Sequence, residues 1–406
     1  MKLPTLPAIS ATAAISIMAS ASADDLVESI IPHAMARAVS QYEKLYTSQE
    51  DPNLLPRTLN ADGTVRSVRF EDWTSGFYPG SLWFLYEYTG QEVWKSRARE
   101  VTNRLERIRH FRGNHDGGFM LGCSFGNALR LDPRDEDRAV LRDAATALAS
   151  RYYPNIGMIR SWDHGNYTCP VIIDNMMNLE LLTWAAKNGG DRKLGQIAVS
   201  HADQTDANHF RPDGSAYHVV DYNPENGWVR GIHAMQGADV RTPWARGQAW
   251  GLYGFVMMHR ETGNEAYLDR ATKLADFLIA HPNLPSDKVP YWDYGAEPGD
   301  ETPRDASAAA IIASALIELS TLTDGDAAAG YLDHARQILR SLASPAFLAG
   351  AGTNGGFILT RSTGHLPGNI EISVPLNYAD YYFLEAMLRY RDLAAGVERV
   401  HFGQAK

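Results

Sequence analysis

The chain has 406 residues, of which 45% are hydrophobic and 21% are charged, and this balance argues against intrinsic disorder. Its net charge of −10 at pH 7 argues against nucleic acid or an anionic membrane as a partner, so an acidic ligand would need a local pocket of Arg or His. The two cysteines, Cys123 and Cys169, are too few and too distant for a cysteine-based zinc site, and two buried thiols are favoured over a disulfide.

The first 23 residues differ from the rest of the chain. Lys2 precedes a small and apolar stretch, LPAISATAAISIMAS, and the sequence ASA comes before Asp24 and Asp25. The stretch is too short to span a membrane, and ASA is typical of a cleavage site after Ala23. We therefore expect residues 1–23 to be a signal peptide, and the mature chain to be periplasmic or secreted. No cysteine follows the stretch, which argues against a lipoprotein.

Helical patterns dominate the mature chain, and strand patterns are sparse. Apolar residues recur at three- and four-residue spacing in the segments 26–48, 81–90, 93–110, 137–150, 173–187, 194–209, 245–261, 265–280, 305–322, 328–342 and 376–394. No run after the first 23 residues is apolar enough to cross a bilayer.

A short pattern repeats within these segments. It is a glycine, then a large apolar residue after four positions and an alanine after four more, as in Gly90-Trp94-Ala98, Gly190-Leu194-Ala198 and Gly263-Tyr267-Ala271, with Tyr331 and Ala335 as a partial copy. The glycine suits a helix end, and the alanine lets two helices approach closely. The pattern indicates about six helix hairpins, and their uneven lengths favour a closed (α/α)6 toroid over an open solenoid. We expect residues 24–406 to form one all-α domain.

Two segments place a carboxylate where chemistry is possible. In VIIDNMMNLELLTWAA, Asp174 lies between apolar residues and a predicted helix, so it suits either a helix N-cap or a proton donor with a raised pKa. In NHDGGFMLGCSFGNALRL, which we expect to be a loop, His115 and Asp116 precede a glycine pair that can present a carboxylate at a cavity mouth, although Asp-Gly is also a common turn.

A third segment gathers polar and aromatic residues between 213 and 255. It contains His218, Gln236, Arg246 and Trp250, and the last two are one helical turn apart. Arg binds carboxylates and Trp stacks on sugar rings, but the alternative is that Trp244 and Trp250 are core residues and that Arg246 pairs with an Asp. The histidines lack the spacing of a zinc helix, so we expect neither a metal nor another cofactor.

Aromatic residues in loops, together with carboxylates, are typical of a carbohydrate site. Most tryptophans of a globular protein belong to the core, and we favour Trp73 and Trp250 over Trp83 as ligand-binding residues.

Several segments together resemble glycoside hydrolase family 88, the unsaturated glucuronyl hydrolases. They run in order over nearly the whole mature chain and include FYPGSLWFLYEYTG, HDGGFMLGCSFGNALRL, VIIDNMMNLELLTWAA, QGADVRTPWARGQAWGLYGF and NYADYYFLEAMLR. The resemblance implies an (α/α)6 toroid, in agreement with the repeat. It also implies hydration of the C4=C5 vinyl ether of a 4,5-unsaturated uronic acid at the non-reducing end of a lyase-generated oligosaccharide.

The resemblance also implies roles for individual residues. Asp174 corresponds to the general acid and base, and Asp116 to a second acid that holds water or substrate and raises the pKa of Asp174. The residues implied to contact the unsaturated sugar are Trp73, His115, His218, Gln236, Arg246 and Trp250.

The chain departs from the family pattern at Thr242-Pro243, at Gly117 and at Ala238-Asp239-Val240, so the preferred polysaccharide does not follow from the resemblance. Two alternatives are an unsaturated rhamnogalacturonyl hydrolase of the related family 105 and a non-catalytic glycan-binding toroid. The presence of both Asp116 and Asp174 argues against the second alternative. The sequence leaves the oligomeric state open.

Overall fold

A computed structural model of the chain describes residues 24–399 and 401–403. The predicted signal peptide lies outside the described residues. Within them, no helix combines the length and the apolar character that a membrane span requires.

The chain is mostly helical. The α-helices of the described residues are α1 (Ile31–Thr47), α2 (Phe77–Thr89), α3 (Glu92–Arg104), α4 (Asn127–Leu131), α5 (Asp135–Ala149), α6 (Leu179–Lys187), α7 (Lys193–Asn208), α8 (Ala245–Thr262), α9 (Glu265–Ala280), α10 (Ala306–Leu319), α11 (Gly325–Leu342) and α12 (Asn377–Ala394). The π-helices η1 (Leu26–Ile30) and η3 (Gly118–Gly126) and the 3-10 helices η2 (Leu105–Ile108), η4 (Ile173–Asn178) and η5 (Asn354–Gly356) complete the helical set.

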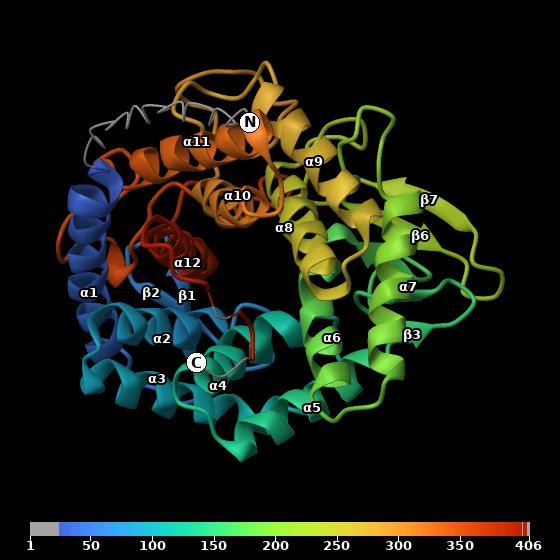
Figure 1. Ribbon diagram of the computed structural model, residues 1–406, viewed down its shortest axis with the longest axis horizontal. Helices are drawn as coiled ribbons and strands as arrows, with labels where there is room; N and C mark the ends of the chain where they lie inside the picture. The colour runs from blue at the N-terminus through green and yellow to red at the C-terminus, as the bar shows by residue number, and fades with distance from the viewer. Residues whose placement is uncertain (1–23, 400, 404–406) are drawn as a thin grey trace, which may run out of the picture.

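The helices form two concentric rings (Figure 1). The inner ring consists of α2, η3, α6, α8, α10 and α12, and each of these helices contacts the next. The ring closes where α12 contacts α2. In the outer ring, α3, α5, α7, α9 and α11 each pack against the inner helix that precedes them, and α1 contacts α12 and α2. The predicted (α/α)6 toroid is thus confirmed.

The repeated residues occupy the predicted places between the rings. Trp94, Leu194 and Tyr267 are buried at the starts of outer helices, and Tyr331 is buried in the second turn of α11. The alanines four positions later are fully buried. Gly90 and Gly263 end α2 and α8 with φ of 65° and 70°. The pattern was wrong at Gly190, because Gly189 has the positive φ at that turn.

Residues 118–131 were expected to be a loop, but they form η3 and α4 of the inner ring. The segment escaped detection because nearly all of its residues are buried, so no polar face marks the helical period. Its glycines permit close packing, since a Cβ at Gly122 or Gly126 would meet the ring of Phe402.

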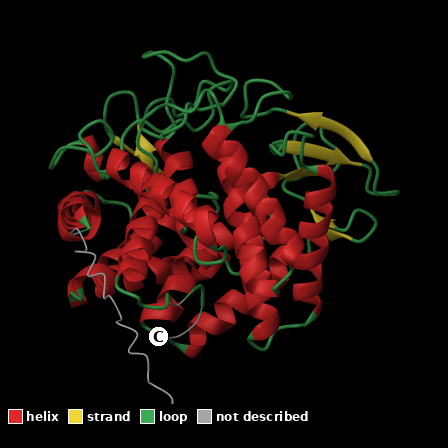
Figure 2. Cartoon of the chain, turned by 45° about the horizontal axis from the view of Figure 1, so that its top comes forward, coloured by secondary structure: helices red, strands yellow, loops and turns green. Residues whose placement is uncertain are grey.

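Short strands lie at one end of the barrel, among the long loops (Figure 2). β1 (Leu55–Leu59) pairs with β2 (Val65–Val68), and β3 (Tyr152–Tyr153) with β4 (Met158–Ile159). β5 (Pro170–Ile172), β6 (Val219–Tyr222) and β7 (Val229–His233) form an antiparallel sheet with the order β5-β6-β7. β5 leads directly into η4 and so places Asp174.

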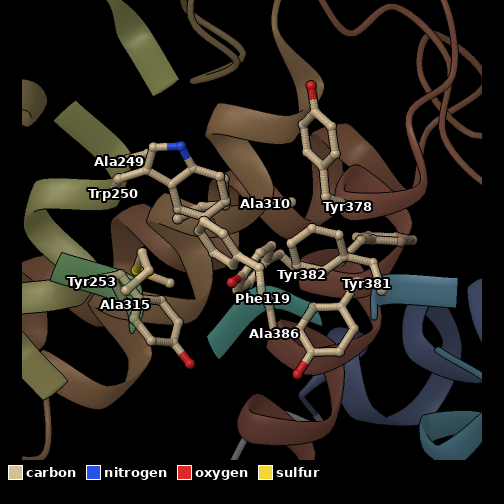
Figure 3. Close-up of a cluster of buried hydrophobic side chains, with 14 of the residues drawn as sticks. Phe119, Ala249, Trp250, Tyr253, Ala310, Ala315, Tyr378, Tyr381, Tyr382 and Ala386 are labelled. Carbon is tan, nitrogen blue, oxygen red and sulfur yellow. The ribbon is translucent and has the colours of Figure 1, made fainter. Parts of the chain in front are cut away.

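Aromatic side chains fill the centre of the barrel (Figure 3). The ring of Trp250 lies 5.0 Å from that of Phe119 and 5.4 Å from that of Tyr382. Cys123 and Cys169 are free thiols, which the sequence favoured over a disulfide; Cys169 is buried as expected, and Cys123 is only partly buried.

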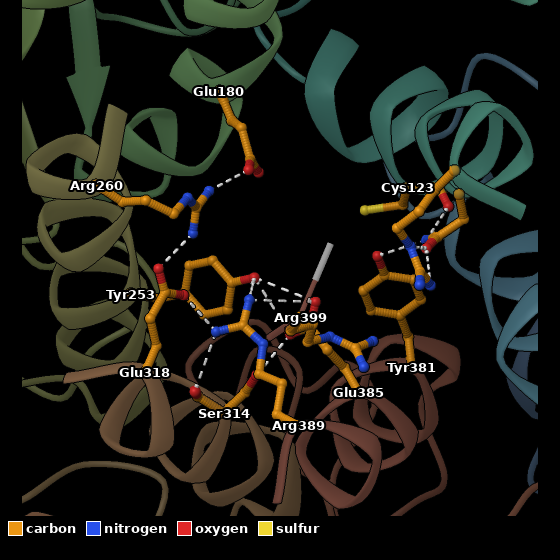
Figure 4. A network of polar contacts seen from close by, with 12 residues as sticks. Cys123, Glu180, Tyr253, Arg260, Ser314, Glu318, Tyr381, Glu385, Arg389 and Arg399 are labelled. Atoms are coloured by element: carbon orange, nitrogen blue, oxygen red, sulfur yellow. Dashed lines mark hydrogen bonds and ion pairs between the residues drawn. The ribbon is translucent and has the colours of Figure 1, made fainter. Parts of the chain in front are cut away.

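The end of the barrel opposite the loops is closed by a buried ionic network (Figure 4). Arg260 of α8 pairs with Glu180 of α6 and with Glu318 of α10. Arg389 of α12 donates to Glu318 Oε2 at 2.5 Å and to the hydroxyl of Tyr253 at 2.6 Å. The network ties four inner helices together at this end.

Candidate active site

Inner helices begin around one cavity at the loop-rich end. Asp116 lies two residues before η3, and Asp174, Arg246 and Tyr378 are the second residues of η4, α8 and α12. Helix N-termini carry unpaired N–H groups and the positive end of the helix dipole. This end of the barrel therefore suits an anionic ligand.

The cavity has a volume of about 300 Å³. It contains six of the eight predicted site residues, namely Trp73, His115, Asp116, Asp174, Gln236 and Arg246. The other lining residues are Arg57, Asn114, Ser161, Trp162, His164, Ile172, Met235, Gly364, His365, Ile370, Glu371 and Tyr378. Two acids that are far apart in the sequence thus share one compartment.

Asp174 does not cap its helix. Ile172 occupies the N-cap position of η4, and no side chain caps the helix. Asp174 is buried, and its Oδ2 atom has no hydrogen-bond partner in the described part of the chain. Burial raises the pKa of Asp174 to about 7, and the positive charge of Arg246 opposes this rise. A carboxyl group with a pKa near neutrality can both donate and accept a proton.

His218 lies behind Asp174. Its Nε2 is 3.8 Å from Asp174 Oδ2, and its Nδ1 is 2.9 Å from the carbonyl oxygen of Ala234. The backbone nitrogen of Gln236 is farther from Nδ1, at 3.2 Å, so we assign the ring proton to Nδ1 as a donor to Ala234. Burial lowers the pKa of His218 to about 3, and the ring stays neutral. An unprotonated nitrogen facing Asp174 favours the protonated carboxyl.

Asp116 is held at the start of η3. Its N–H group donates to Asn114 Oδ1 at 3.0 Å, and its Oδ1 is 3.4 Å from Nε2 of His115. Burial raises the pKa of Asp116 well above its usual value, and the negative charge of Asp174 raises it further. His115 is buried and its pKa is lowered to about 3, chiefly by that burial, so it is neutral beside the carboxyl.

The two acids influence each other. Burial is the largest cause of the raised pKa at both carboxyls, and the negative charge of Asp174 adds to the rise at Asp116. Asp174, with a pKa of about 7, can change its protonation near neutral pH.

Arg246 combines the two interpretations of the sequence. It lines the cavity, but its Nη1 donates to Asp305 Oδ2 at 2.8 Å and to the Thr363 carbonyl at 2.6 Å, and its Nη2 donates to the Gly364 carbonyl at 2.5 Å. Asp305 also accepts hydrogen bonds from the first turn of α10. Arg246 thus brings positive charge to the cavity while it anchors the loop at residues 362–374.

Trp73 and Gln236 lie at the cavity, and Trp250 does not line it. Trp73 is half-buried beside Tyr378, with 5.0 Å between the ring centroids, and Gln236 Nε2 donates to the Gly364 carbonyl at 3.0 Å. Trp250 has no exposed surface and lies in the core against Phe119. The four-residue spacing correctly put Trp250 on the face of Arg246, but one turn deeper in the barrel.

Other lining residues were missed by sequence reasoning. Arg57 of β1 donates to Glu371 at 2.6 Å and to Asp72 at 2.9 Å, which fixes the loop at residues 362–374 from a second side. Glu371 is one of several residues of this loop with positive φ, a conformation that is rare for side-chain-bearing residues. Sequence reasoning did not single out Trp162, Arg57 or Glu371 as residues of the site.

No group of three or more His, Cys, Asp and Glu residues in the described chain is arranged to hold a metal ion.

Comparisons with known proteins agree with this architecture, although no family model matches the chain. The chain is 44% identical to an unsaturated glucuronyl hydrolase of Formosa agariphila, over 87% of this chain and 89% of that protein. It is 35% identical to an unsaturated glucuronyl hydrolase of a Bacillus species, over 81% and 89% of the two chains. An unsaturated chondroitin disaccharide hydrolase of Streptococcus pneumoniae is 32% identical over 90% and 93%.

Solved structures give the same result. The crystal structure of an unsaturated glucuronyl hydrolase specific for heparin has a TM-score of 0.88 and 43% identity, and the match covers 90% of this chain and 98% of that chain. The unsaturated glucuronyl hydrolase of Bacillus sp. GL1 has a TM-score of 0.82 and 29% identity over 90% and 97%. The chain therefore belongs to the unsaturated glucuronyl hydrolase family and is a glycosidase.

Proposed function

We propose that the protein releases a 4,5-unsaturated uronic acid from the non-reducing end of oligosaccharides that polysaccharide lyases produce. The observation that carries the proposal is that Asp116 and Asp174 line one cavity and that the pKa of Asp174 is about 7. Support for the substrate class comes from relatives whose names specify heparin or chondroitin disaccharides. We extend to this chain only the shared feature, an unsaturated uronate next to another sugar.

Asp174 is the general acid of the proposed reaction. Its carboxyl group donates a proton to C4, and positive charge develops at C5 and the ring oxygen. Water then adds to C5, and the Asp174 carboxylate takes the proton that this water loses. The hemiketal formed at C5 opens, and the neighbouring sugar leaves. The anomeric carbon is not attacked, so the separation of the two carboxyls does not set a stereochemical outcome as in ordinary glycosidases.

Asp116 keeps its proton through this cycle. A neutral carboxyl can donate a hydrogen bond to a sugar hydroxyl or to the attacking water, whereas an ionised carboxyl can only accept hydrogen bonds. The same proton removes charge repulsion when Asp174 becomes ionised. The two acids thus have different proposed roles: Asp174 exchanges its proton during the reaction, and Asp116 keeps its own.

The uronate carboxylate binds on the Arg246 side of the cavity. Arg57 forms ion pairs with two carboxylates, Asp72 and Glu371, whereas Arg246 forms an ion pair with Asp305 and lies near Asp174, which is protonated when it acts as the acid. The local charge is therefore more favourable to an anion near Arg246, and the helix N-termini add to this preference.

A panel of unsaturated disaccharides made by lyases tests the proposal through loss of the ultraviolet absorbance of the conjugated acid. We include substrates from glycosaminoglycans, ulvan, gellan and xanthan. At least one is expected to lose its absorbance with the wild type, Asp174→Asn is expected to be inactive, and Asp116→Asn to be slower. Asp300→Asn, at an exposed site, is the control. An unimpaired Asp174→Asn variant would contradict the proposal.

We also propose that the protein acts in the periplasm or outside the cell. The supporting feature is the uncharged stretch after Lys2, with ASA before Asp24. Expression of the full chain in a Gram-negative host, followed by fractionation and N-terminal sequencing, tests this point. A mature protein that begins at Asp24 is expected, and a cytoplasmic protein that retains the first 23 residues would contradict it.

A further inference from the structure

One wall of the cavity continues outward along the sheet β5-β6-β7. Trp162 and Ile172 line the cavity, and with Val219 of β6 they form a small buried cluster against which Tyr167 packs. Val219 is paired with His233 of β7. Directly paired residues carry their side chains on the same face of a sheet, so His233 shares the face that adjoins the cavity.

Aromatic rings lead from the cavity to the outside along this face. The ring of Trp162 lies 5.7 Å from that of Tyr167 at an interplanar angle of 78°, and Tyr167 lies 5.1 Å from His233 at 77°. Trp162 is buried, Tyr167 is half-buried and His233 is exposed, so the chain of rings runs from the interior to the surface. Edge-to-face contacts hold the rings in fixed orientations.

Exposed apolar side chains also lie at the cavity. Met235 is 38% exposed and Ile370 is 43% exposed, and both line the cavity. Exposed apolar surface of this kind marks ligand-binding sites, and aromatic planes suit the apolar faces of sugars.

A cation contacts Thr168, the residue that follows Tyr167. The Arg230 side chain is 53% exposed and donates to Thr168 Oγ1, and its Nε is 3.9 Å from Asp221 Oδ2. Asp221 already accepts hydrogen bonds from the N–H groups of Thr168 and Cys169, and its own side chain is only 9% exposed. The exposed part of the guanidinium therefore remains open to an anionic group from solvent.

We propose that Tyr167, Arg230 and His233 form an outer subsite that binds the sugar units following the cleaved uronate in substrates longer than a disaccharide. The inference rests on the proposed function, because it assumes that the terminal uronate lies at the two acids. The volume of about 300 Å³ is at the lower end of the range for ligand sites, so we place the further sugar units of longer substrates outside the cavity. Tyr167 stacks on a sugar face, and Arg230 pairs with a sulfate or carboxylate on the same unit.

Substrate length tests the outer subsite. We compare kcat/KM for an unsaturated disaccharide and an unsaturated tetrasaccharide from the same sulfated polysaccharide. The wild type is expected to prefer the tetrasaccharide, and the double variant Tyr167→Ala/His233→Ala is expected to lower the tetrasaccharide-to-disaccharide ratio at least fivefold. Tyr88→Ala is the matched control, because this half-buried tyrosine lies near the end of α2 away from the cavity. A ratio that the double variant leaves within twofold of wild type would overturn the inference.

The Arg230→Gln variant tests the anionic contact. It is expected to lower the ratio for the sulfated tetrasaccharide and to leave the ratio for a desulfated tetrasaccharide unchanged. An equal ratio for Arg230→Gln and wild type on the sulfated substrate would overturn the role of Arg230.

Binding separates this inference from the proposed function. These binding measurements use calorimetry in the Asp174→Asn background. Tyr167→Ala/His233→Ala is expected to lower the affinity for the tetrasaccharide at least fivefold more than the affinity for the disaccharide. If the wild type cleaves no unsaturated disaccharide but this binding difference appears, the proposed function fails and the outer subsite stands. If the disaccharide is cleaved and neither the ratio nor the binding difference changes, the outer subsite alone fails.

Discussion

Gly118 lies directly against Asn178, and this contact joins the two helices that position the acids. Asn178 Oδ1 accepts a hydrogen bond from the N–H of Phe119 at 3.0 Å, and a Cβ on Gly118 would lie 2.7 Å from Asn178 Cα. Gly118 begins η3 just after Asp116, and Asn178 ends η4, which carries Asp174. The separation of the two acids is therefore set by a contact between backbones.

Gly118→Ala is expected to disturb this contact. Its Cβ would push η3 and η4 apart, with a cost of about 1–3 kcal/mol in the free energy of unfolding and a fall in kcat of at least tenfold. Gly117→Ala is the matched control, because a Cβ there would meet its nearest neighbours at 3.5 to 3.8 Å, which is ordinary contact. Kinetics and thermal unfolding of both variants check the prediction. Equal kcat values for the two variants would show that the contact does not position the acids.

The pH dependence of activity should follow Asp174. Because Asp174 must be protonated to act as the acid and its pKa is about 7, kcat/KM is expected to fall as the pH rises through about 7. Asp116→Asn is expected to lower the rate without moving this alkaline limb, because Asp116 keeps its proton in the proposed cycle and so places no charge beside Asp174. A limb that moves in Asp116→Asn would contradict the assignment of the pKa to burial.

The charge of Arg246 should also affect the pH at which kcat/KM falls. Arg246→Met removes the positive charge that lowers the pKa of Asp174, so the alkaline limb is expected to move to higher pH. The variant also leaves Asp305 and two loop carbonyls without their donor, and breaking such a buried pair costs about 3–5 kcal/mol in stability. Arg246→Lys keeps the positive charge and is the control. Its kcat/KM is expected to fall at the same pH as that of the wild type. pH–rate profiles that coincide for the Met variant and the wild type would contradict the prediction.

Buried neutral histidines should make the fold sensitive to acid. Burial lowers the pKa of His209 to about 3, and neither ring nitrogen has a partner among the described residues. The unfolded chain therefore binds a proton below about pH 6.5 that the folded chain does not, and stability falls as the pH drops from there towards 3. At pH 5 this amounts to about 2 kcal/mol for one such histidine.

Urea unfolding at pH 7.5 and pH 5 checks the contribution of His209. The loss of stability between the two pH values is expected to be smaller in His209→Gln than in the wild type. His110→Gln, at an exposed position, is the control and is expected to retain the full loss. Carboxyls with raised pKa values, such as Asp380, act in the opposite direction, and they cancel when variant and wild type are compared. The same loss in His209→Gln as in the wild type would contradict the prediction.

The outer helices and the hairpin repeat were predictable because each has one buried and one exposed face. In α3, Trp94 and Ala98 lie on the buried face, and the opposite face is exposed to solvent. This contrast produces the four-residue spacing that the sequence reveals. Residues 118–126 have no such contrast, since the inner ring surrounds them, and their helix was missed.

The site was predictable where one segment carried both a reactive group and its surroundings. Asp174 could be recognised as a carboxyl with a raised pKa because its apolar neighbours adjoin it in sequence. Arg57 and Glu371 are more than 300 residues apart, and only the closed ring brings them together. The depth of Trp250 was equally hidden, because helical spacing gives a direction around the axis but not the distance from the cavity.

The most direct test of the account is the position of the new proton. The protein is incubated with an unsaturated disaccharide in D₂O, and the released uronic acid is examined by NMR at early times. Proton donation by Asp174 predicts loss of the C4=C5 double bond, with one deuterium at C4 in a single configuration and no reaction with Asp174→Asn. A released sugar that retains its double bond, or deuterium in both configurations at C4, would contradict the account.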